Sequence, residues 1–254
     1  MAHWASAPFR RLLKYMEESD RLVALSVDGI RKIATMVPLA EALHNLNKDL
    51  MERHEVEQSE RGIVLTRERA EFARREIEND FPLLHAHTLV GIWGAFEAAV
   101  EDLAVLILVN DPTARNRDAI SKVKVSIAEF ESLDSDERMR LIVQELQRTL
   151  RAEQRLGVNA FEVVLQAVGL DGVVKKKLSK DLFEYQQIRH AVVHRGSVAD
   201  RCLMQRCPWL RLRPGDPILI RHKDYRRLAN AIMDYSVAVI ERLRKKYALK
   251  KDDA

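Results

Sequence analysis

Glycine, proline and aromatic residues are scarce in this chain. Of 254 residues, nine are glycine and seven are proline, and aromatic residues make up 6%. Proteins built from strands depend on turn-forming residues and are enriched in aromatic and β-branched side chains. Leucine, alanine, glutamate, arginine and lysine dominate instead, and these residues favour helices. The composition therefore predicts an all-α protein.

The chain also lacks a long apolar run and has few cysteines. Its most apolar run, residues 103–109, is too short to span a bilayer, and residues 1–10 contain no secretory pattern. Two cysteines, Cys202 and Cys207, do not make a disulfide framework, and no further metal ligands accompany them. We therefore expect a cytoplasmic protein with reduced thiols and without a membrane anchor, a metal or a cofactor.

The charge of the chain is unevenly distributed. The net charge is +4, but residues 175–227 contain fourteen Lys and Arg against five Asp and Glu, so the remainder carries −5. A basic surface attracts phosphate backbones, although most charged segments are simply solvated. Both interpretations stay open for this segment. If it binds RNA, the expected contacts are Lys175, Lys176, Lys177, Arg195, Arg211 and Arg213.

Apolar residues recur at helical spacing along the whole chain. Helices are expected at residues 9–18, 19–50 with a kink at Pro38, 66–80, 82–110, 135–150, 159–169, 174–195 and 223–247. Gly196 is a natural stop for the helix at 174–195, and the Pro- and Gly-containing segment 197–221 is expected to form a long loop with a small strand pair. We divide the chain into an N-terminal helical arm packed on the core (1–79), a helical domain (80–248) and a disordered tail (249–254).

One segment of the helix at 174–195 carries chemically reactive side chains. Arg189 falls inside an apolar stripe, between Ile188 and Val193, and His190 and His194 follow it. A guanidinium keeps its charge in a core, so it must be paired or face a wet cleft. In one interpretation, Arg189 forms a buried ion pair with a glutamate of the helix at 82–110, either Glu97 or Glu101.

In the other interpretation, this segment cleaves RNA without a metal. Histidine can serve as the base for the 2′-hydroxyl proton and as the acid for the leaving oxygen. Arginine can stabilise the charged phosphorane. On an ideal helix Arg189 and His194 point about 140° apart, so a two-fold dimer of such helices is needed to assemble them. His85 and His87, two apart on their helix, are interpreted as surface or capping groups.

Arg189-x4-His194 at the end of a helix, followed by Arg-Gly-Ser-Val-Ala-Asp (195–200), resembles the HEPN superfamily. The surrounding pattern adds to the resemblance: the upstream helix His-Thr-Leu-Val-Gly-Ile-Trp-Gly-Ala-Phe-Glu (87–97), the loop Gly-Asp-Pro-Ile-Leu-Ile (215–220) and a closing helix with Tyr235. It covers residues 85–247 and is nearest to the bacterial RNase LS-like and stress- or phage-defence toxin families. His190 stands where those families more often have Asn or Asp.

This resemblance implies an up-and-down helical bundle that forms a homodimer through the motif helices and acts as a metal-independent endoribonuclease. It implies that Arg189 and His194 are the catalytic pair, that His190 is an auxiliary polar group and that Glu97 is a weaker candidate. The implied partners are RNA, a second copy and an antitoxin or defence-system protein. Two alternatives stay open: a noncatalytic module of this superfamily that binds RNA or protein, and an unrelated helical scaffold.

Overall fold

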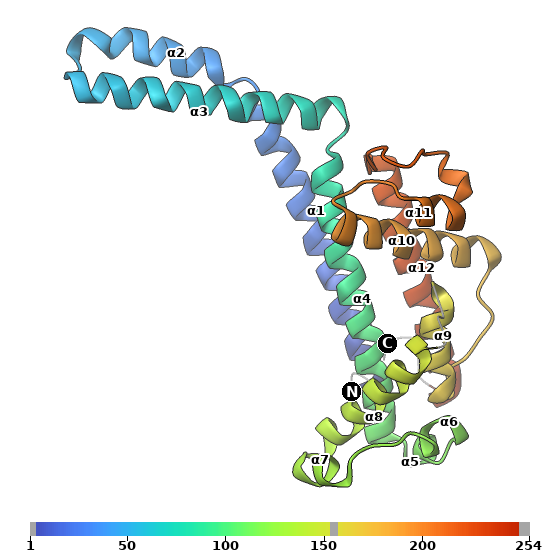
Figure 1. Cartoon of the computed structure of the whole chain (residues 1–254). Helices are drawn as coiled ribbons and strands as arrows, with labels where there is room; N and C mark the ends of the chain where they lie inside the picture. Colours follow the sequence, from blue (N-terminus) through green and yellow to red (C-terminus); the bar gives the residue numbers. More distant parts are fainter. Residues whose placement is uncertain (1–3, 153–156, 249–254) are drawn as a thin grey trace. The chain divides into compact units, whose positions relative to one another are not determined.

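Helix-forming residues give a helical protein. The computed structural model describes residues 4–152 and 157–248, and within these ranges it is all-α, as predicted (Figure 1). The expected strand pair is reduced to one isolated antiparallel bridge between Val198 and Pro217. The α-helices are α1 (Ala7–Ile33), α2 (Met36–Asn47), α3 (Arg53–Glu78), α4 (Pro82–Asn110), α5 (Pro112–Arg115), α6 (Asp118–Ser121), α7 (Ile127–Ser132), α8 (Ser135–Ala152), α9 (Val158–Ala167), α10 (Lys176–Arg195), α11 (Arg201–Arg206) and α12 (His222–Tyr247), and the 3-10 helices are η1 (Trp4–Ser6), η2 (Lys48–Leu50) and η3 (Pro208–Leu210).

The chain divides into two compact units. The first takes the described residues within 1–17, 89–218 and 226–254, and the second takes residues 18–88 and 219–225. The chain passes from one unit to the other within α1, within α4, between Ile218 and Leu219 and within α12. The division at residue 80 stays a prediction. The predicted tail, 249–254, lies outside the described residues.

An aromatic cluster forms the core of the first unit. The ring of Trp93 lies 5.0 Å from that of Tyr185, and the ring of Phe96 lies 4.6 Å from that of Phe161 and 5.6 Å from that of Tyr235. All five side chains are buried. Edge-on and tilted packing of this kind adds stability beyond the buried area itself. The cluster joins α4, α9, α10 and α12, and so fixes the helix that carries the candidate catalytic residues.

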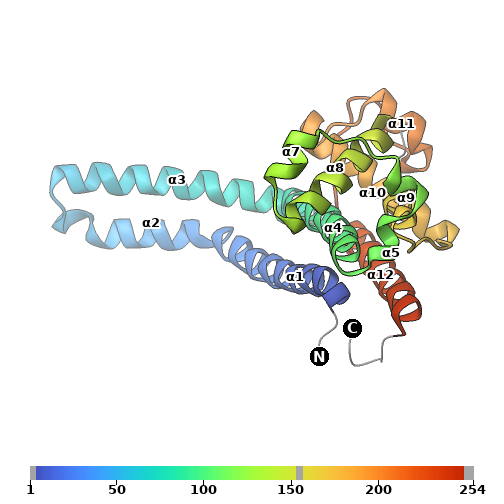
Figure 2. The ribbon, with the colours of Figure 1, turned by 90° about the horizontal axis from the view of Figure 1, so that it is seen from below.

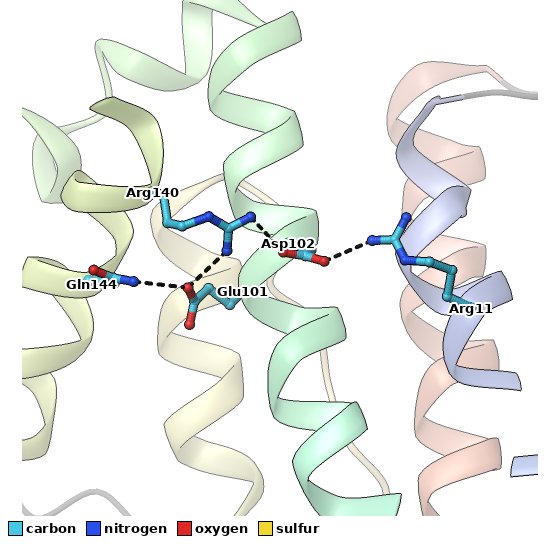
Figure 3. A network of polar contacts seen from close by, with 5 residues as sticks. All are labelled: Arg11, Glu101, Asp102, Arg140 and Gln144. Atoms are coloured by element: carbon cyan, nitrogen blue, oxygen red, sulfur yellow. Dashed lines mark hydrogen bonds and ion pairs between the residues drawn. The ribbon is translucent and has the colours of Figure 1, made fainter. Parts of the chain in front are cut away.

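A polar network ties α1, α4 and α8 together within the same unit (Figure 3). Asp102 accepts hydrogen bonds from Arg11 at 2.8 Å and from Arg140 at 2.9 Å, and Arg140 also donates to Glu101 at 3.1 Å. The bond to Asp102 is the main cause that raises the pKa of Arg140. Of the two glutamates considered as partners of Arg189, Glu101 is therefore engaged by Arg140.

In the second unit, α2 and α3 run side by side as a helical hairpin, in both views (Figures 1 and 2). Arg67 donates to Glu41 at 2.6 Å, and His44 lies 2.9 Å from the Ser59 hydroxyl. The arm is helical, as expected. Its leucines, however, were expected to be covered, and those of α2 and η2 are exposed: Leu39, Leu43, Leu46 and Leu50.

The connection between α3 and α4 lies beside His85, which is buried and not, as predicted, a surface or capping residue. Asp80 and Phe81 both adopt positive φ, at 62° and 57°, a conformation that costs energy for residues other than glycine. The Asp80 carboxylate accepts from the backbone N–H of His222 at 2.7 Å. His85, predicted to lie at the surface, is fully buried beside this connection and stacks on Tyr225 with ring centroids 5.0 Å apart. His87 is exposed, as predicted.

Two further predicted boundaries are wrong. Ser19 was expected to begin a second helix, but α1 continues through it without a break, because no proline or glycine interrupts residues 9–28. The segment 197–221 was expected to be a loop, and it contains α11 and η3, each with a residue pattern too short to give a periodic signal. None of the described helices has the length and apolarity that crossing a membrane requires.

Candidate active site

The C-terminal turn of α10 carries the candidate catalytic residues. The opposite face of this helix is held to the core by Tyr185, which is buried and donates a hydrogen bond to the Leu89 carbonyl at 2.7 Å. Gly196 ends the helix in the left-handed conformation at φ 60°, as its position predicted. The reactive side chains are therefore mounted on a rigid element at the point where the backbone turns away.

His190 and His194 are exposed on one face of this turn, with ring centroids 4.7 Å apart. Burial is the largest cause that lowers the pKa of His190, followed by the charges of His194, Arg195 and Arg206, while Asp200 opposes them. Positive charges favour the neutral imidazole. Both imidazoles are therefore accessible, and the surroundings of His190 favour its neutral form, which can accept a proton.

Arg189 lies on a different face of α10, and 31% of its side chain is exposed. Its Nη2 atom is 3.9 Å from the Glu97 Oε2 atom, which is an ion pair but too long for a hydrogen bond. The Nε atom of Arg189 is buried and has no hydrogen-bond partner. The structure thus brings Arg189 and Glu97 together without a hydrogen bond between them, and it leaves the Nε donor of Arg189 unsatisfied.

Two residues that sequence reasoning did not single out, Asp200 and Arg206, complete the surroundings of the histidine pair together with Arg195, which was expected to contact RNA. Asp200 caps α11 by accepting from the Leu203 N–H at 2.7 Å, and Arg195 forms an ion pair with it at 3.4 Å. Arg206 donates to Gln187, a buried residue of α10, at 2.9 Å. Asp200 is a favoured N-cap residue, and this was the signal in the sequence that could have indicated α11 in a segment predicted to be a loop. Nothing in the sequence alone pointed to Arg206.

The segment after α10 is anchored by a buried carboxylate. Glu184 accepts from the Trp209 indole N–H at 2.6 Å and pairs with Arg227, which also donates to Asp181 at 2.6 Å. Next to it, burial raises the pKa of Cys207 to about 12, so this thiol stays protonated. These contacts hold η3 against α10 and keep the cationic residues around the histidine pair in place.

The predicted RNA contacts do not gather at one place. All six are exposed: Lys175, Lys176, Lys177, Arg195, Arg211 and Arg213. Arg195 directly follows His194 in the last turn of α10. Lys176 begins α10 and His194 lies in its last turn, so the two are separated by roughly 27 Å at 1.5 Å per residue. An RNA that reached both ends of α10 would have to extend over several nucleotides.

A groove of about 740 Å³ lies between the beginning of α10 and α12. Lys175 and Lys177 line it together with acidic side chains, Asp181, Asp234 and Glu241. None of Arg189, His190 and His194 is among its lining residues. Because its charges are mixed, this groove does not extend the positive surface around the histidine pair.

Within residues 4–152 and 157–248, no three His, Cys, Asp or Glu side chains are grouped in a way that could hold a metal ion. The chain matches no protein-family model, no curated protein and no solved structure.

Proposed function

We propose that the chain is a metal-independent endoribonuclease of the HEPN type. The observation that carries the proposal is the exposed pair His190 and His194, 4.7 Å apart at the end of a rigid helix and surrounded by arginines. The chemistry requires accessible imidazoles and fixed positive charge, and these side chains supply both. The resemblance connects such an activity with stress or phage defence.

The reaction is an internal transesterification. The RNA 2′-oxygen attacks the adjacent phosphorus as its proton passes to a neutral imidazole. The bond from phosphorus to the 5′-oxygen then breaks, and that oxygen takes a proton. The products are a 2′,3′-cyclic phosphate and a 5′-hydroxyl. His194 takes or returns the proton, His190 assists as a neutral neighbour, and Arg189 stabilises the phosphorane.

A complete site needs two copies of α10. Arg189 and His194 lie about 140° apart around one ideal helix, so they do not face the same phosphate. A two-fold axis through paired motif helices places the guanidinium of one protomer opposite the imidazole of the other. Phe183, on the histidine face of α10, is the residue expected to lie in that contact.

The contact between Arg189 and Glu97 favours a second candidate, a noncatalytic RNA- or protein-binding module. A carboxylate 3.9 Å from the guanidinium offsets part of its charge. In such a module Arg189 stabilises the packing of α10 on α4, and the basic residues bind a partner without cleavage. The scaffold alternative differs from it in having no RNA affinity at all.

A matched set of variants separates these candidates. Wild type, His194→Ala, Arg189→Ala and the control His87→Ala are expressed in a bacterial host and scored for growth arrest and RNA breakdown. We expect only wild type and the control to degrade RNA, because His87 is an exposed histidine outside the site. Purified protein is then tested for RNA binding. Binding without cleavage by wild type supports the noncatalytic module, and absence of both supports the scaffold.

A further inference from the structure

The hairpin of the second unit carries a regular apolar stripe that stays exposed among the residues that the structure describes. Along α2 and η2, large apolar residues occur at alternating intervals of three and four: Met36, Leu39, Leu43, Leu46 and Leu50. This spacing, 3.5 residues on average, is the a/d pattern of a helix that packs against another helix. We call these five residues the α2 seam.

The seam is exposed to solvent. Its members range from 43% exposed at Met36 to 84% at Leu50. A contiguous run of exposed leucines on a folded protein marks an interaction surface far more often than an ordinary surface. The exposure therefore needs a partner to explain it.

The seam is not the face that α2 uses to pack on α3. The hairpin is held by Glu41, which pairs with Arg67, and by His44, which contacts Ser59. At 100° per residue, Glu41 lies about 190° and His44 about 130° around the helix from the centre of the seam. The inner face of the hairpin is thus already satisfied, and the seam is a second face of the same helix.

Within α2, the residues that flank the seam are small and uncharged; the charged residues Lys48 and Asp49 lie beyond it, in η2 beside Leu50. Ala40 and Ala42 flank Leu39 and Leu43, and among the residues of α2 the only Asp, Glu, Lys or Arg is Glu41, which is engaged by Arg67. Alanines let two helices approach closely. Two identical seams can therefore meet without bringing like charges together, and no charge on the seam calls for an oppositely charged protein.

We propose that the α2 seam binds a second copy of this chain through antiparallel pairing of the two α2 helices. In that register, across a two-fold axis near residue 41, Met36 faces Leu46 and Leu39 faces Leu43. The four seam residues within α2 then cover one another, and Leu50, in η2, lies beyond the paired segment. Leucines occupy both the a and the d positions of the seam, and its flanks within α2 are uncharged. The seam can therefore pair with an identical seam, which is the requirement of an isologous contact. This contact is separate from the pairing of α10, and it does not depend on the chain being a ribonuclease.

The test is a charge exchange at the central layer of the full-length protein. Leu39→Glu/Leu43→Glu places glutamates opposite each other in a homodimer, and Leu39→Lys/Leu43→Lys does the same with lysines. Sedimentation velocity at about 20 μM should show each variant at half the mass of the wild-type assembly. Mixing the two variants should restore that mass, because each glutamate then faces a lysine. Both residues favour helices, and circular dichroism checks that the hairpin is folded.

The control is Leu219→Glu, which charges a leucine of similar exposure in the same unit but outside the seam. It should leave the mass unchanged. A wild type that stays monomeric overturns the proposal, since the seam then serves another partner. Double variants that keep the wild-type mass also overturn it. A variant at Phe183 that alone halves the mass assigns association to α10 instead. Because the readout is mass, absence of RNA cleavage does not affect the result.

Discussion

The imidazole rings of His190 and His194 lie 4.7 Å apart between centroids, across one turn of α10. At this separation the two rings do not readily carry positive charge together, and the charges of Arg195 and Arg206 add to the same effect on His190. These effects favour the neutral form of His190, which is the form that can accept a proton as a general base.

The pKa of His190 should respond to each charge around it in a defined direction. Arg195→Gln should raise it and Asp200→Asn should lower it further, because these residues act on it with opposite signs. Asparagine keeps the cap of α11. Titration of the imidazole C–H signals by NMR measures both shifts. Arg201→Gln is the control, because Arg201 lies nearby in sequence but is not among the residues that shift the pKa of His190. Equal pKa values in all four proteins would contradict this account of the electrostatics.

Cleavage should continue in EDTA and require the 2′-hydroxyl. The proposed base, acid and phosphorane contact are all side chains, and the nucleophile belongs to the RNA itself. A 2′-deoxy substitution at the cleaved nucleotide should therefore stop the reaction, while His194→Ala should slow it by about 10² to 10⁴. Products are identified by mass spectrometry as the 2′,3′-cyclic phosphate or its 3′-phosphate. Cleavage of DNA, or loss of activity in EDTA, would show that the mechanism is wrong.

RNA affinity should fall steeply with salt if the basic segment contacts phosphates. Each neutralised phosphate of a single strand contributes about −0.7 to the slope of log K against log salt. Replacing Lys175, Lys176 and Lys177 by Gln should reduce that slope by about 2 if all three bind. Lys122→Gln/Lys124→Gln, outside the basic segment, should leave it unchanged. Fluorescence anisotropy between about 50 and 200 mM salt measures the slopes.

Sequence reasoning predicted α10 well because several signals agree there. Apolar spacing places Tyr185 and Ile188 on the buried face, and Gly196 ends the helix. It also placed the histidine pair on one face, since residues four apart on a helix are neighbours. Arg189 was correctly expected near Glu97, but the choice between Glu97 and Glu101 required the position of Arg140, which belongs to a distant helix.

Burial was harder to predict where it depends on contacts distant in sequence. His85 becomes buried because Ile220 and Tyr225, more than a hundred residues later, lie over it. The leucines of α2 have the spacing of a core face, yet spacing does not tell which apolar face meets the same chain and which is left open. The position of Arg206 was also not predicted, because it depends on the hydrogen bond that Arg206 donates to Gln187 on another helix.

Asp102 should stabilise the first unit more than a simple surface ion pair does. It accepts from Arg11 of α1 and from Arg140 of α8, so one carboxylate joins three helices (Figure 3). Asp102→Ala should lower the free energy of unfolding by about 1 kcal/mol, the upper end for partly exposed pairs. The control Asp118→Ala removes an i,i+4 pair with Lys122 and should cost at most about 0.5 kcal/mol. Urea denaturation followed by circular dichroism compares them; equal losses would show that the network adds nothing.

Stability should decrease in mild acid because of His85. This imidazole is fully buried, its Nδ1 lies 3.1 Å from the Ile220 carbonyl, and its Nε2 has no hydrogen-bond partner. To donate to a carbonyl, the neutral ring must carry its proton on Nδ1, which leaves Nε2 as a buried acceptor. Burial is the largest cause that lowers the pKa of His85, and the nearby His222 lowers it further, while Asp80 and the Ile220 carbonyl oppose the shift.

The sign of the effect follows from which state binds the proton first. As pH falls below 6.5, His85 of the unfolded chain is protonated before that of the folded chain, so the free energy of unfolding decreases until the lowered folded pKa is passed. His85→Gln cannot titrate. It should therefore be less stable at pH 8, where it loses the packing on Tyr225, yet lose less additional stability between pH 8 and pH 5 than wild type does. Urea midpoints at several pH values give both slopes, and His87→Gln, at an exposed histidine of the same helix, should keep the wild-type slope. If the slopes of wild type and His85→Gln coincide, the acid sensitivity has another origin, and the buried ring titrates as an ordinary histidine.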